Sequence, residues 1–230
     1  MRIAITVPDP PQGKVKYEDP AVLALVGKFS PKKVTPYYCE FLPDDYETAD
    51  IIVIARDRVL DLLIHDIEKL ENRRERTSDP DEQALLDRVL AGLEAETPVC
   101  DQEFSEPDRE RLRTISPLSM KPTLIIDGDA AGPNDLIPRA LEKAGLMFFY
   151  TSGQPEVHAW LVRRGADAVT CAGKIHSDLA RGFVKAEIVP VDDLLQCHSL
   201  QDARKRDLTR LVDREFVIPE KTVIDIRFNV

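Results

Sequence analysis

The chain has 230 residues, of which 43% are hydrophobic, so it is long enough to bury one or two modest cores. Its net charge of −10 at pH 7 argues against binding to DNA or other broad nonspecific contact with nucleic acid. No apolar run approaches the roughly 20 residues of a membrane-spanning helix, and the four cysteines form no CxxC pair that would indicate a zinc site or a disulfide framework. We therefore expect a cytoplasmic protein with reduced thiols.

The charge is unevenly distributed along the chain. Residues 146–230 hold 12 acidic and 12 basic side chains, so the whole net charge of −10 lies on residues 1–145. An acidic N-terminal part beside a neutral C-terminal module is suited to a protein partner, or to one localised RNA contact through the C-terminal module.

Four short apolar runs predict buried strands of a parallel sheet, because each is rich in β-branched or aromatic residues and is followed by polar or turn residues. These runs cover residues 2–7, 34–41, 50–55 and 122–126. They assign the N-terminal part of the chain to the α/β class.

Between the third and fourth runs, apolar residues at i, i+3 and i+4 spacing predict two amphipathic helices, one from Val59 to Leu70 and the other from Ala84 to Leu93. Asp79 suits the N-cap of the second helix, and Pro80 suits its first turn. Two charged helices joined by a short break predict an antiparallel hairpin.

The C-terminal part alternates between helix and strand patterns. A helix is predicted over residues 134–145, ending at Gly145. Strands are predicted over 157–163 and 184–189, with a terminal pair at 216–218 and 222–228. Between these strands, apolar residues from Ala172 to Phe183 lie along one helix face. The pattern indicates strands packed on one helix.

A series of short segments in this C-terminal part carries a family resemblance. The segments are Phe148-Phe149-Tyr150-Thr151-Ser152-Gly153, Glu156-Val157-His158-Ala159-Trp160, Ala172-Gly173-Lys174-Ile175-His176-Ser177-Asp178, Arg181-Gly182-Phe183 and Arg227-Phe228-Asn229-Val230. The series resembles the C-terminal TGS domain (named after threonyl-tRNA synthetase, GTPase and SpoT) of the YchF/Obg-like P-loop ATPases. Weaker similarity extends over nearly the whole chain, including residues 29–36 and 118–123.

The resemblance implies a two-domain α/β architecture. Residues 1–145 would form a trimmed parallel sheet of the P-loop type, with the helical hairpin inserted at about 56–113. Residues 146–230 would form a β-grasp, ubiquitin-like TGS domain. The family's association with ribosomes implies the translation apparatus as partner.

The stretch that should bind phosphate departs from the family pattern. A P-loop reads GxxxxGK[ST], so that backbone amides wrap the phosphates, the lysine neutralises them and the hydroxyl holds Mg²⁺. Here Gly13 and Lys14 remain, but Pro8 replaces the first glycine and Val15 replaces the hydroxyl residue. Proline at residues 8, 10 and 11 removes backbone N–H donors from this loop. We expect this loop to hold no triphosphate.

Two further departures from the family pattern also remove motifs that bind nucleotide. The family's Asp-x-x-Gly switch is missing after Phe41, and residues 127–130 stand where an Asn-x-x-Glu-type base reader is expected. Three losses indicate a degenerate nucleotide-binding domain, and we therefore predict no catalytic residue, no cofactor and no metal site. Four carboxylates at strand ends could hold Mg²⁺, but turn and capping chemistry explains them better. They are Asp44, Asp45, Asp127 and Asp129.

The candidate partner or ligand face lies in the C-terminal module. Strand alternation puts His158 and Trp160 on one face, which would be the outer one if the aliphatic residues between them face the helix. With Arg163 and Arg164 nearby, the exposed indole would suit a protein, an RNA base or a ring-bearing ligand. Alternatively, Trp160 packs against the N-terminal domain. His176 belongs to the same series, although hydrogen bonding from helix to loop explains it better than catalysis.

The leading functional prediction is a non-catalytic TGS-domain binding or regulatory protein related to YchF, with a protein or ribosomal RNA partner. The alternative is a residual ATP- or GTP-binding protein, or a weak NTPase with Mg²⁺, that uses Gly13 and Lys14 in a distorted P-loop. A small regulatory ligand on the TGS face is a third hypothesis. The basic cluster at 204–206 is predicted to lie on a solvated helix with Asp202–Arg206 pairing. The sequence leaves the oligomeric state open, and association through the hairpin is one option.

Overall fold

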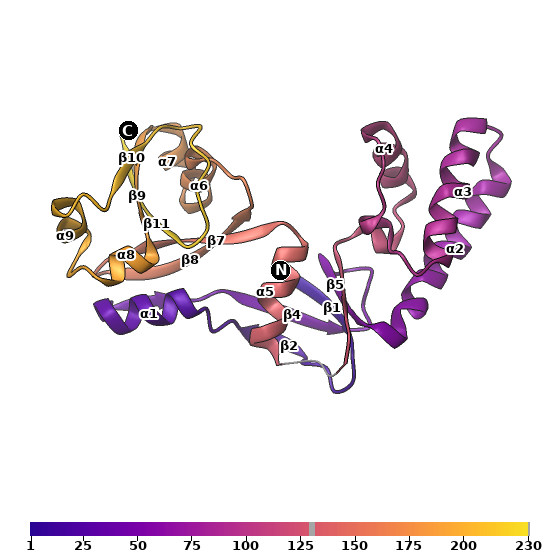
Figure 1. Ribbon diagram of the computed structural model, residues 1–230, viewed down its shortest axis with the longest axis horizontal. Helices are drawn as coiled ribbons and strands as arrows, with labels where there is room; N and C mark the ends of the chain where they lie inside the picture. The colour runs from indigo at the N-terminus through magenta and orange to yellow at the C-terminus, as the bar shows by residue number, and fades with distance from the viewer. Residues whose placement is uncertain (129–131, 230) are drawn as a thin grey trace. The chain divides into compact units, whose positions relative to one another are not determined.

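Figure 1 shows the computed structural model, which describes residues 1–128 and 132–229. The chain divides into two compact units. Unit 1 comprises Met1–Val15 and Cys39–Ala144, and unit 2 comprises Lys16–Tyr38 and Gly145–Val230. The chain passes from unit 1 to unit 2 between residues 144 and 145, next to the predicted domain boundary. The predicted assignment of residues 16–38 to the N-terminal domain is wrong, because this segment belongs to unit 2.

The sheet of unit 1 is centred on β1 (Arg2–Thr6), which runs parallel to β4 (Tyr38–Pro43) on one side and to β5 (Ile51–Ala55) on the other. The full strand order is β2-β4-β1-β5-β6, with β2 at Gly13–Lys16 and β6 at Thr123–Ile126. All five residues of β5 are buried, as expected for a parallel strand with both faces covered.

Helices of unit 1 follow β5 and β6. A 3-10 turn at Arg56–Arg58 leads into α2 (Val59–Arg76), which packs against α3 (Pro80–Glu94) through leucines of one buried cluster. Further along the chain lie 3-10 turns at Val99–Asp101 and Leu118–Met120, with α4 (Glu106–Ile115) between them and α5 (Pro133–Lys143) after β6. Within the described part of the chain, no helix combines the length and apolar character that crossing a membrane requires.

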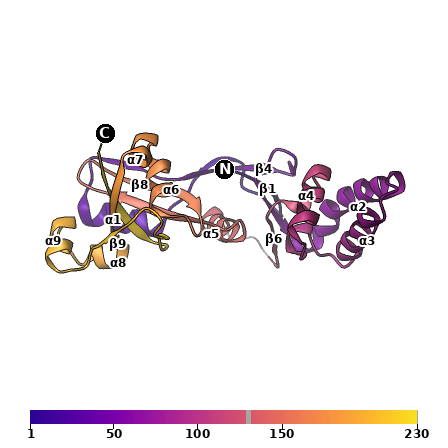
Figure 2. The same cartoon turned by 90° about the horizontal axis from the view of Figure 1, so that it is seen from above.

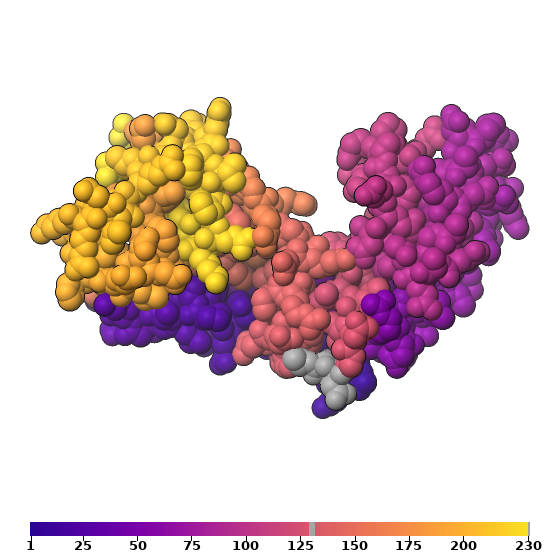
Figure 3. All heavy atoms as spheres, viewed as in Figure 1, coloured from indigo at the N-terminus to yellow at the C-terminus, as the bar shows by residue number. Residues whose placement is uncertain are grey.

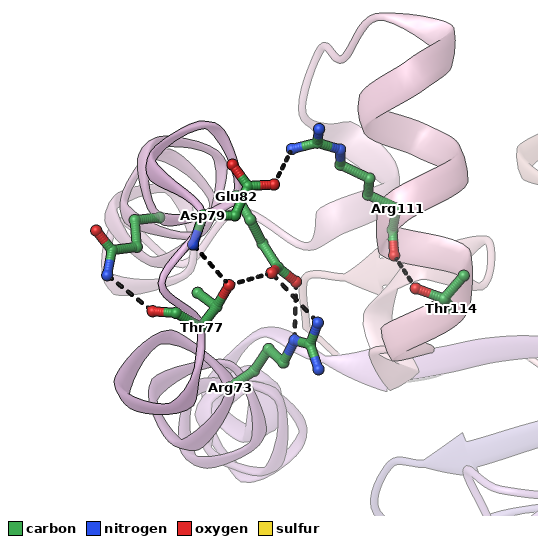
Figure 4. Close-up of polar contacts among 7 residues, drawn as sticks. Arg73, Thr77, Asp79, Glu82, Arg111 and Thr114 are labelled. Atoms are coloured by element: carbon green, nitrogen blue, oxygen red, sulfur yellow. Dashed lines mark hydrogen bonds and ion pairs between the residues drawn. The ribbon is translucent and has the colours of Figure 1, made fainter.

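The turn between α2 and α3 is fixed by side-chain hydrogen bonds (Figure 4). The predicted helix start is confirmed: the Asp79 side chain accepts a hydrogen bond from the Asp81 amide at 3.0 Å, and Pro80 occupies the first turn. Glu82 accepts two hydrogen bonds from Arg73, at 2.8 and 3.2 Å, and one from Thr77. These contacts join the end of one helix to the start of the next.

A buried carboxylate attaches this helix pair to the rest of unit 1. Asp66 of α2 has no exposed surface, and its two oxygens accept hydrogen bonds from the backbone amides of Leu118 and Ser119 at 2.5 and 2.7 Å. Because a buried carboxylate needs such partners, α2 is held against the 3-10 turn that precedes β6.

Unit 2 contains a mixed sheet with the strand order β10-β9-β11-β7-β8-β3. Its strands are β3 (Lys33–Thr35), β7 (Leu146–Ser152), β8 (Glu156–Arg163), β9 (Phe183–Pro190), β10 (Arg210–Val212) and β11 (Thr222–Phe228). Strands β7 and β8 are antiparallel, whereas β3 joins β8 in parallel from an N-terminal segment more than a hundred residues away in sequence.

Both faces of the unit 2 sheet are covered. Tyr150 and Ala159 pack on one face with α1 (Pro20–Phe29), α8 (Val191–Leu195) and α9 (Leu200–Lys205). Their strand neighbours Phe149 and Val162 pack on the opposite face with α6 (Ala168–Ile175), which continues into α7 (Ser177–Arg181). Figures 1 and 2 show α1 beneath the C-terminal strands, and in Figure 3 its indigo atoms lie against the yellow and orange ones. The prediction that the strands pack on one helix therefore accounts for only one face of this sheet.

Three predicted elements differ from the structure. The run 34–41 is divided between β3 of unit 2 and β4 of unit 1, because Pro36 lacks an N–H for a sheet ladder. The helix face from Ala172 to Phe183 is interrupted at His176, which is extended (φ −162°, ψ 142°). The predicted strand 216–218 provides only a single bridge, from Val217 to Asp167.

Candidate functional site

The first candidate site lies at the carboxyl edge of the unit 1 sheet, where parallel strands end together and doubly wound folds bind their ligands. Thr6 ends β1 and is 4% exposed. Its hydroxyl donates to Asp44 Oδ1 at 2.8 Å and lies 2.7 Å from the Tyr46 hydroxyl. After the next strand, Arg56 Nε donates to Asp127 Oδ1 at 3.0 Å. Hydroxyl, carboxylate and guanidinium groups thus gather along one edge.

The neighbouring carboxylate serves the turn chemistry that we predicted for it. Asp45 accepts hydrogen bonds from the hydroxyl and the amide of Thr48 at 2.6 and 3.1 Å, and the hydroxyl bond in particular lowers the pKa of Asp45. Asp129 lies outside the described residues. Among the residues that are described, no three or more histidine, cysteine or acidic side chains gather as a metal site.

Gly13 and Lys14 lie in an edge strand of the same sheet. Gly13 begins β2 with φ +71°, a left-handed conformation that glycine adopts without strain, and Lys14 is exposed beside it. The chain that leaves β1 therefore enters a strand, and the next helix, α1, belongs to unit 2. The Gly-Lys pair therefore begins a strand, whereas the Gly-Lys pair of a P-loop leads into a helix.

The second candidate site is a groove in unit 2, between the end of β8 and α6. It encloses about 700 Å³. Its lining residues are Leu146, Leu161, Val162, Arg163, Arg164, Gly165, Ala166, Thr170, Gly173 and Lys174. The two arginines predicted from the sequence thus lie on a hollow surface.

Local geometry sets the shape of this groove. Gly165 has φ +85° in the turn after β8, and the Arg164 amide donates to the Gly145 carbonyl at 2.7 Å. Asp167 then caps α6 by accepting a hydrogen bond from the Thr170 amide at 2.8 Å. A Cβ added at Gly173 would come within 3.3 Å of Ala180 Cβ, so glycine allows α6 and α7 to pack closely.

The cationic side chains of the groove differ in whether they form ion pairs with other described residues. Arg164 forms an ion pair with Glu220. In contrast, neither Arg163 nor Lys174 has an ion pair within residues 1–128 and 132–229, and both side chains are exposed. Sequence reasoning missed Lys174 and Thr170 as site residues. Their i, i+4 spacing on one helix was the available signal.

His158 and Trp160 lie on the sheet face that α6 covers, away from the lining of the groove. The two rings stack with centroids 3.6 Å apart, and the indole N–H donates to Thr151 Oγ1 at 3.0 Å. Trp160 also stacks on Phe149, with centroids 6.3 Å apart. The predicted outer face is therefore partly covered, and these indole contacts all lie within unit 2.

The two histidines have different surroundings. Burial lowers the pKa of His158, and Lys33 acts in the same direction, while Glu156 opposes them only in part. His176 ends α6 and caps α7, because its Nδ1 accepts a hydrogen bond from the Asp178 amide at 3.1 Å. The five residues predicted as one face thus occupy three places: the groove, the stacked ring pair and the α6–α7 junction.

Residues 146–229 match the family model YchF-GTPase_C, described as a protein of unknown function (DUF933). A protein of Bacillus subtilis named ribosome-binding ATPase YchF is 27% identical over 91% of this chain and 73% of its own length. In sequence, this chain is therefore similar to proteins of the YchF family. A ribosome-binding ATPase YchF of Mycoplasma genitalium is 40% identical over 64% of the chain, a match that spans only 35% of that protein. The structure of the Schizosaccharomyces pombe YchF GTPase shares the fold, with a TM-score of 0.78 at 16% identity over 99% of this chain and 97% of that one.

These comparisons correct two predictions. We predicted that the chain is not an enzyme and uses no cofactor. The relatives are named ATPases and the structural neighbour is titled a GTPase, so the YchF comparisons contradict both predictions. The physical reason for the error is that we judged the activity from three local departures in sequence motifs, whereas the fold that surrounds them is shared with the YchF structure.

Proposed function

We propose that this chain associates with the ribosome and binds ATP or GTP with Mg²⁺ as a weak NTPase. The observation that carries the proposal is the shared name of the relatives, ribosome-binding ATPase, in both Bacillus subtilis and Mycoplasma genitalium. The parallel pairing of β1 with β4 on one side and with β5 on the other supports the nucleotide part, since open parallel sheets bind ligands at their carboxyl edge. The proposal implies a cytoplasmic protein.

The residues at that edge fit a nucleotide with its metal. Mg²⁺ takes oxygen ligands and is commonly bound by one or two carboxylates together with phosphate oxygens. Asp44 would supply the carboxylate and Thr6 the hydroxyl, while Lys14 and Arg56 would neutralise phosphate charge. We expect slow turnover, because Val15 lacks the hydroxyl of a P-loop and the loop prolines lack amide donors.

For unit 2 we propose a TGS-type β-grasp module that contacts the ribosome. Its mixed sheet, with α6 packed on one face, is consistent with that assignment, although α1, α8 and α9 also cover the other face. The family match covers residues 146–229 of this unit. Arg163 and Arg164 are the exposed cations of the proposed contact, and His158, Trp160 and His176 lie in the same unit.

Calorimetry with ATP and GTP, with and without Mg²⁺, tests the nucleotide part. At ligand concentrations near 1 mM, an affinity of roughly −4 kcal/mol is measurable. We expect saturable binding that requires Mg²⁺, slow phosphate release, and loss of binding in Lys14→Ala. Lys16→Ala, a change two residues along the same exposed strand, is the matched control and should bind normally. Absence of heat under all conditions would exclude nucleotide binding.

Cosedimentation with purified ribosomes tests the second part separately. We expect the chain in the ribosomal pellet, and less of it there after Arg163→Ala/Arg164→Ala. A chain that stays in the supernatant would contradict ribosome association, whatever the calorimetry shows.

A further inference from the structure

We propose that the groove between β8 and α6 binds an acidic peptide segment, with a carboxylate beside an aliphatic side chain. The site belongs to unit 2 and contains no residue of the nucleotide edge. Arg163 belongs both to this groove and to the proposed ribosome contact, so the inference rests on that proposed contact and deepens it by naming a ligand class.

Charge complementarity at the groove specifies the acidic group. Arg163 comes from β8 and Lys174 from α6, so the two cations approach the groove from different elements. Neither has an ion pair in the described part of the chain, whereas Arg164 is already paired with Glu220. A carboxylate is the group that both cations would bind, through hydrogen bonds assisted by charge.

The nearby acidic residue does not occupy these cations. Asp167 caps α6, and its Oδ1 accepts the Thr170 amide at 2.8 Å. The Thr170 hydroxyl, which also lines the groove, can donate a further hydrogen bond to a ligand carbonyl or carboxylate. The protein thus offers a cation from each side and a hydroxyl donor on the helix.

The floor of the groove specifies the aliphatic part of the ligand. It is formed by Leu146, Leu161, Val162 and Ala166, three of which are only partly buried. Covering such surface is favourable at roughly 25 cal/mol per Å². The volume of about 700 Å³ lies within the usual range of ligand sites.

The same floor favours a peptide over RNA. Bases bind to single-strand sites mainly by stacking on aromatic side chains, and the lining residues of this groove include no aromatic ring. The one tryptophan of the chain is engaged elsewhere, between His158 and Phe149. An aliphatic side chain next to a carboxylate matches this surface better than a nucleotide does.

Fluorescence anisotropy on the full chain tests the proposal, without nucleotide or ribosomes. The probe is a short labelled peptide that alternates glutamate and leucine. Two comparison ligands are the same peptide with glutamine in place of glutamate, and an oligouridylate of similar length. We expect the acidic peptide to bind, with affinity that falls as salt rises, and both comparison ligands to bind at least about tenfold more weakly.

Variants locate the binding at the groove. Arg163→Gln and Lys174→Gln should each weaken the acidic peptide about tenfold or more, as expected for loss of a hydrogen bond to a charged group. Lys205→Gln is the matched control, since Lys205 is an exposed cation of α9 in the same unit and should be neutral. The circular dichroism and Trp160 fluorescence of each variant establish that it is folded.

Three outcomes would overturn the proposal: no peptide binding, equal binding of the glutamate and glutamine peptides, or binding that Arg163→Gln and Lys174→Gln leave unchanged. Preferential binding of the oligouridylate would also overturn it and assign the groove to RNA. The anisotropy assay contains neither nucleotide nor ribosomes, and Lys174→Gln is used in this assay alone, so failure of the peptide proposal is distinguishable from failure of the proposed function.

Discussion

Unit 1 has a sheet in which β1, β4, β5 and β6 are parallel, whereas unit 2 completes a mixed sheet with the N-terminal segment Lys16–Tyr38. Their charges differ as well. The 31 basic and 41 acidic side chains divide into 15 and 27 in unit 1 and into 16 and 14 in unit 2. The acidic surplus thus lies in the unit with the parallel sheet, and the slight basic surplus in the unit with the groove.

The N-terminal segment of unit 2 is part of its core. Asp19 caps α1 through the amides of Ala21 and Val22, and its other oxygen accepts the buried Tyr150 hydroxyl at 2.8 Å. Tyr17 stacks on Phe148 with centroids 5.9 Å apart. Through α1, β3 and the Asp19 cap, the stability of unit 2 depends on residues 16–38. Substitutions in this segment therefore test the division of the chain into two units most directly.

The largest expected effect is that of Leu25→Ala in α1. Leu25 has no exposed surface and packs in the same cluster as Val157 and Val189. We expect a loss of about 2–5 kcal/mol in the unfolding free energy of unit 2, measured by urea denaturation with Trp160 fluorescence. Leu23→Ala is the matched control, because Leu23 is 54% exposed on the same helix and should cost less than about 0.5 kcal/mol. Equal midpoints for both variants would contradict the assignment of α1 to unit 2.

The next effect concerns a buried carboxylate in the sheet of unit 2. Glu187 is 2% exposed and pairs with Arg204 and Arg227 at 2.6 and 3.0 Å. Burial alone would raise its pKa, but hydrogen bonds from Arg204, Thr209 and Arg227 outweigh burial and lower it. Glu187→Gln should cost about 1.5–3 kcal/mol at pH 7, as expected for hydrogen bonds to a charged group.

The pH dependence of this effect has a defined sign. Because the pKa of Glu187 is lower in the folded state, its stabilisation is present above the unfolded pKa of about 4.3 and is lost as pH falls below it. Denaturation of the wild type and Glu187→Gln between pH 7 and pH 3 should therefore show converging stabilities. Asp225→Asn, a more exposed partner of Arg204, is the control with the smaller effect. A constant difference across this range would exclude ionised Glu187 as the cause.

In unit 1 the comparable test is a helix cap. Asp79→Ala removes the side-chain acceptor for the Asp81 amide at the start of α3, and caps of this kind are worth about 0.5–2 kcal/mol. Thermal unfolding followed by helical circular dichroism measures the loss. Ser78→Ala changes the preceding exposed residue and should be neutral. If the two variants melt alike, then the cap contributes nothing measurable to unit 1.

These cases separate what the sequence could predict from what it could not. The start of α3 was predictable because Asp79 and Pro80 act within one turn, and the buried strand β5 because five apolar residues follow one another. The division of residues 34–41 was not, because β3 depends on pairing with β8, more than a hundred residues away.

The same contrast between local signals and long-range pairing holds for the candidate sites. Arg163 and Arg164 could be found as neighbours in sequence, but Lys174 reaches the groove only through the packing of α6 on the sheet. The carboxylates at the edge of unit 1 were visible as residues at strand ends, while the bond from Thr6 to Asp44 required the parallel pairing of β1 and β4. Local signals therefore identified single residues, and long-range pairing decided which of them meet.

The smallest expected effect uses the stacked rings of unit 2 as a pH probe. Burial lowers the pKa of His158 below its ordinary value of 6.5, so the imidazole next to Trp160 is neutral at pH 7. The unfolded chain takes up this proton first, and the stability of unit 2 should decline slightly as pH falls below about 6.5. Because a protonated imidazole quenches a neighbouring indole, Trp160 fluorescence should fall with a midpoint below pH 6.5, and His158→Gln should abolish this step. A midpoint above pH 6.5 would mean that Glu156 raises the pKa of His158 more than burial lowers it. The ring pair would then be more exposed to solvent than the 3.6 Å between its ring centroids indicates.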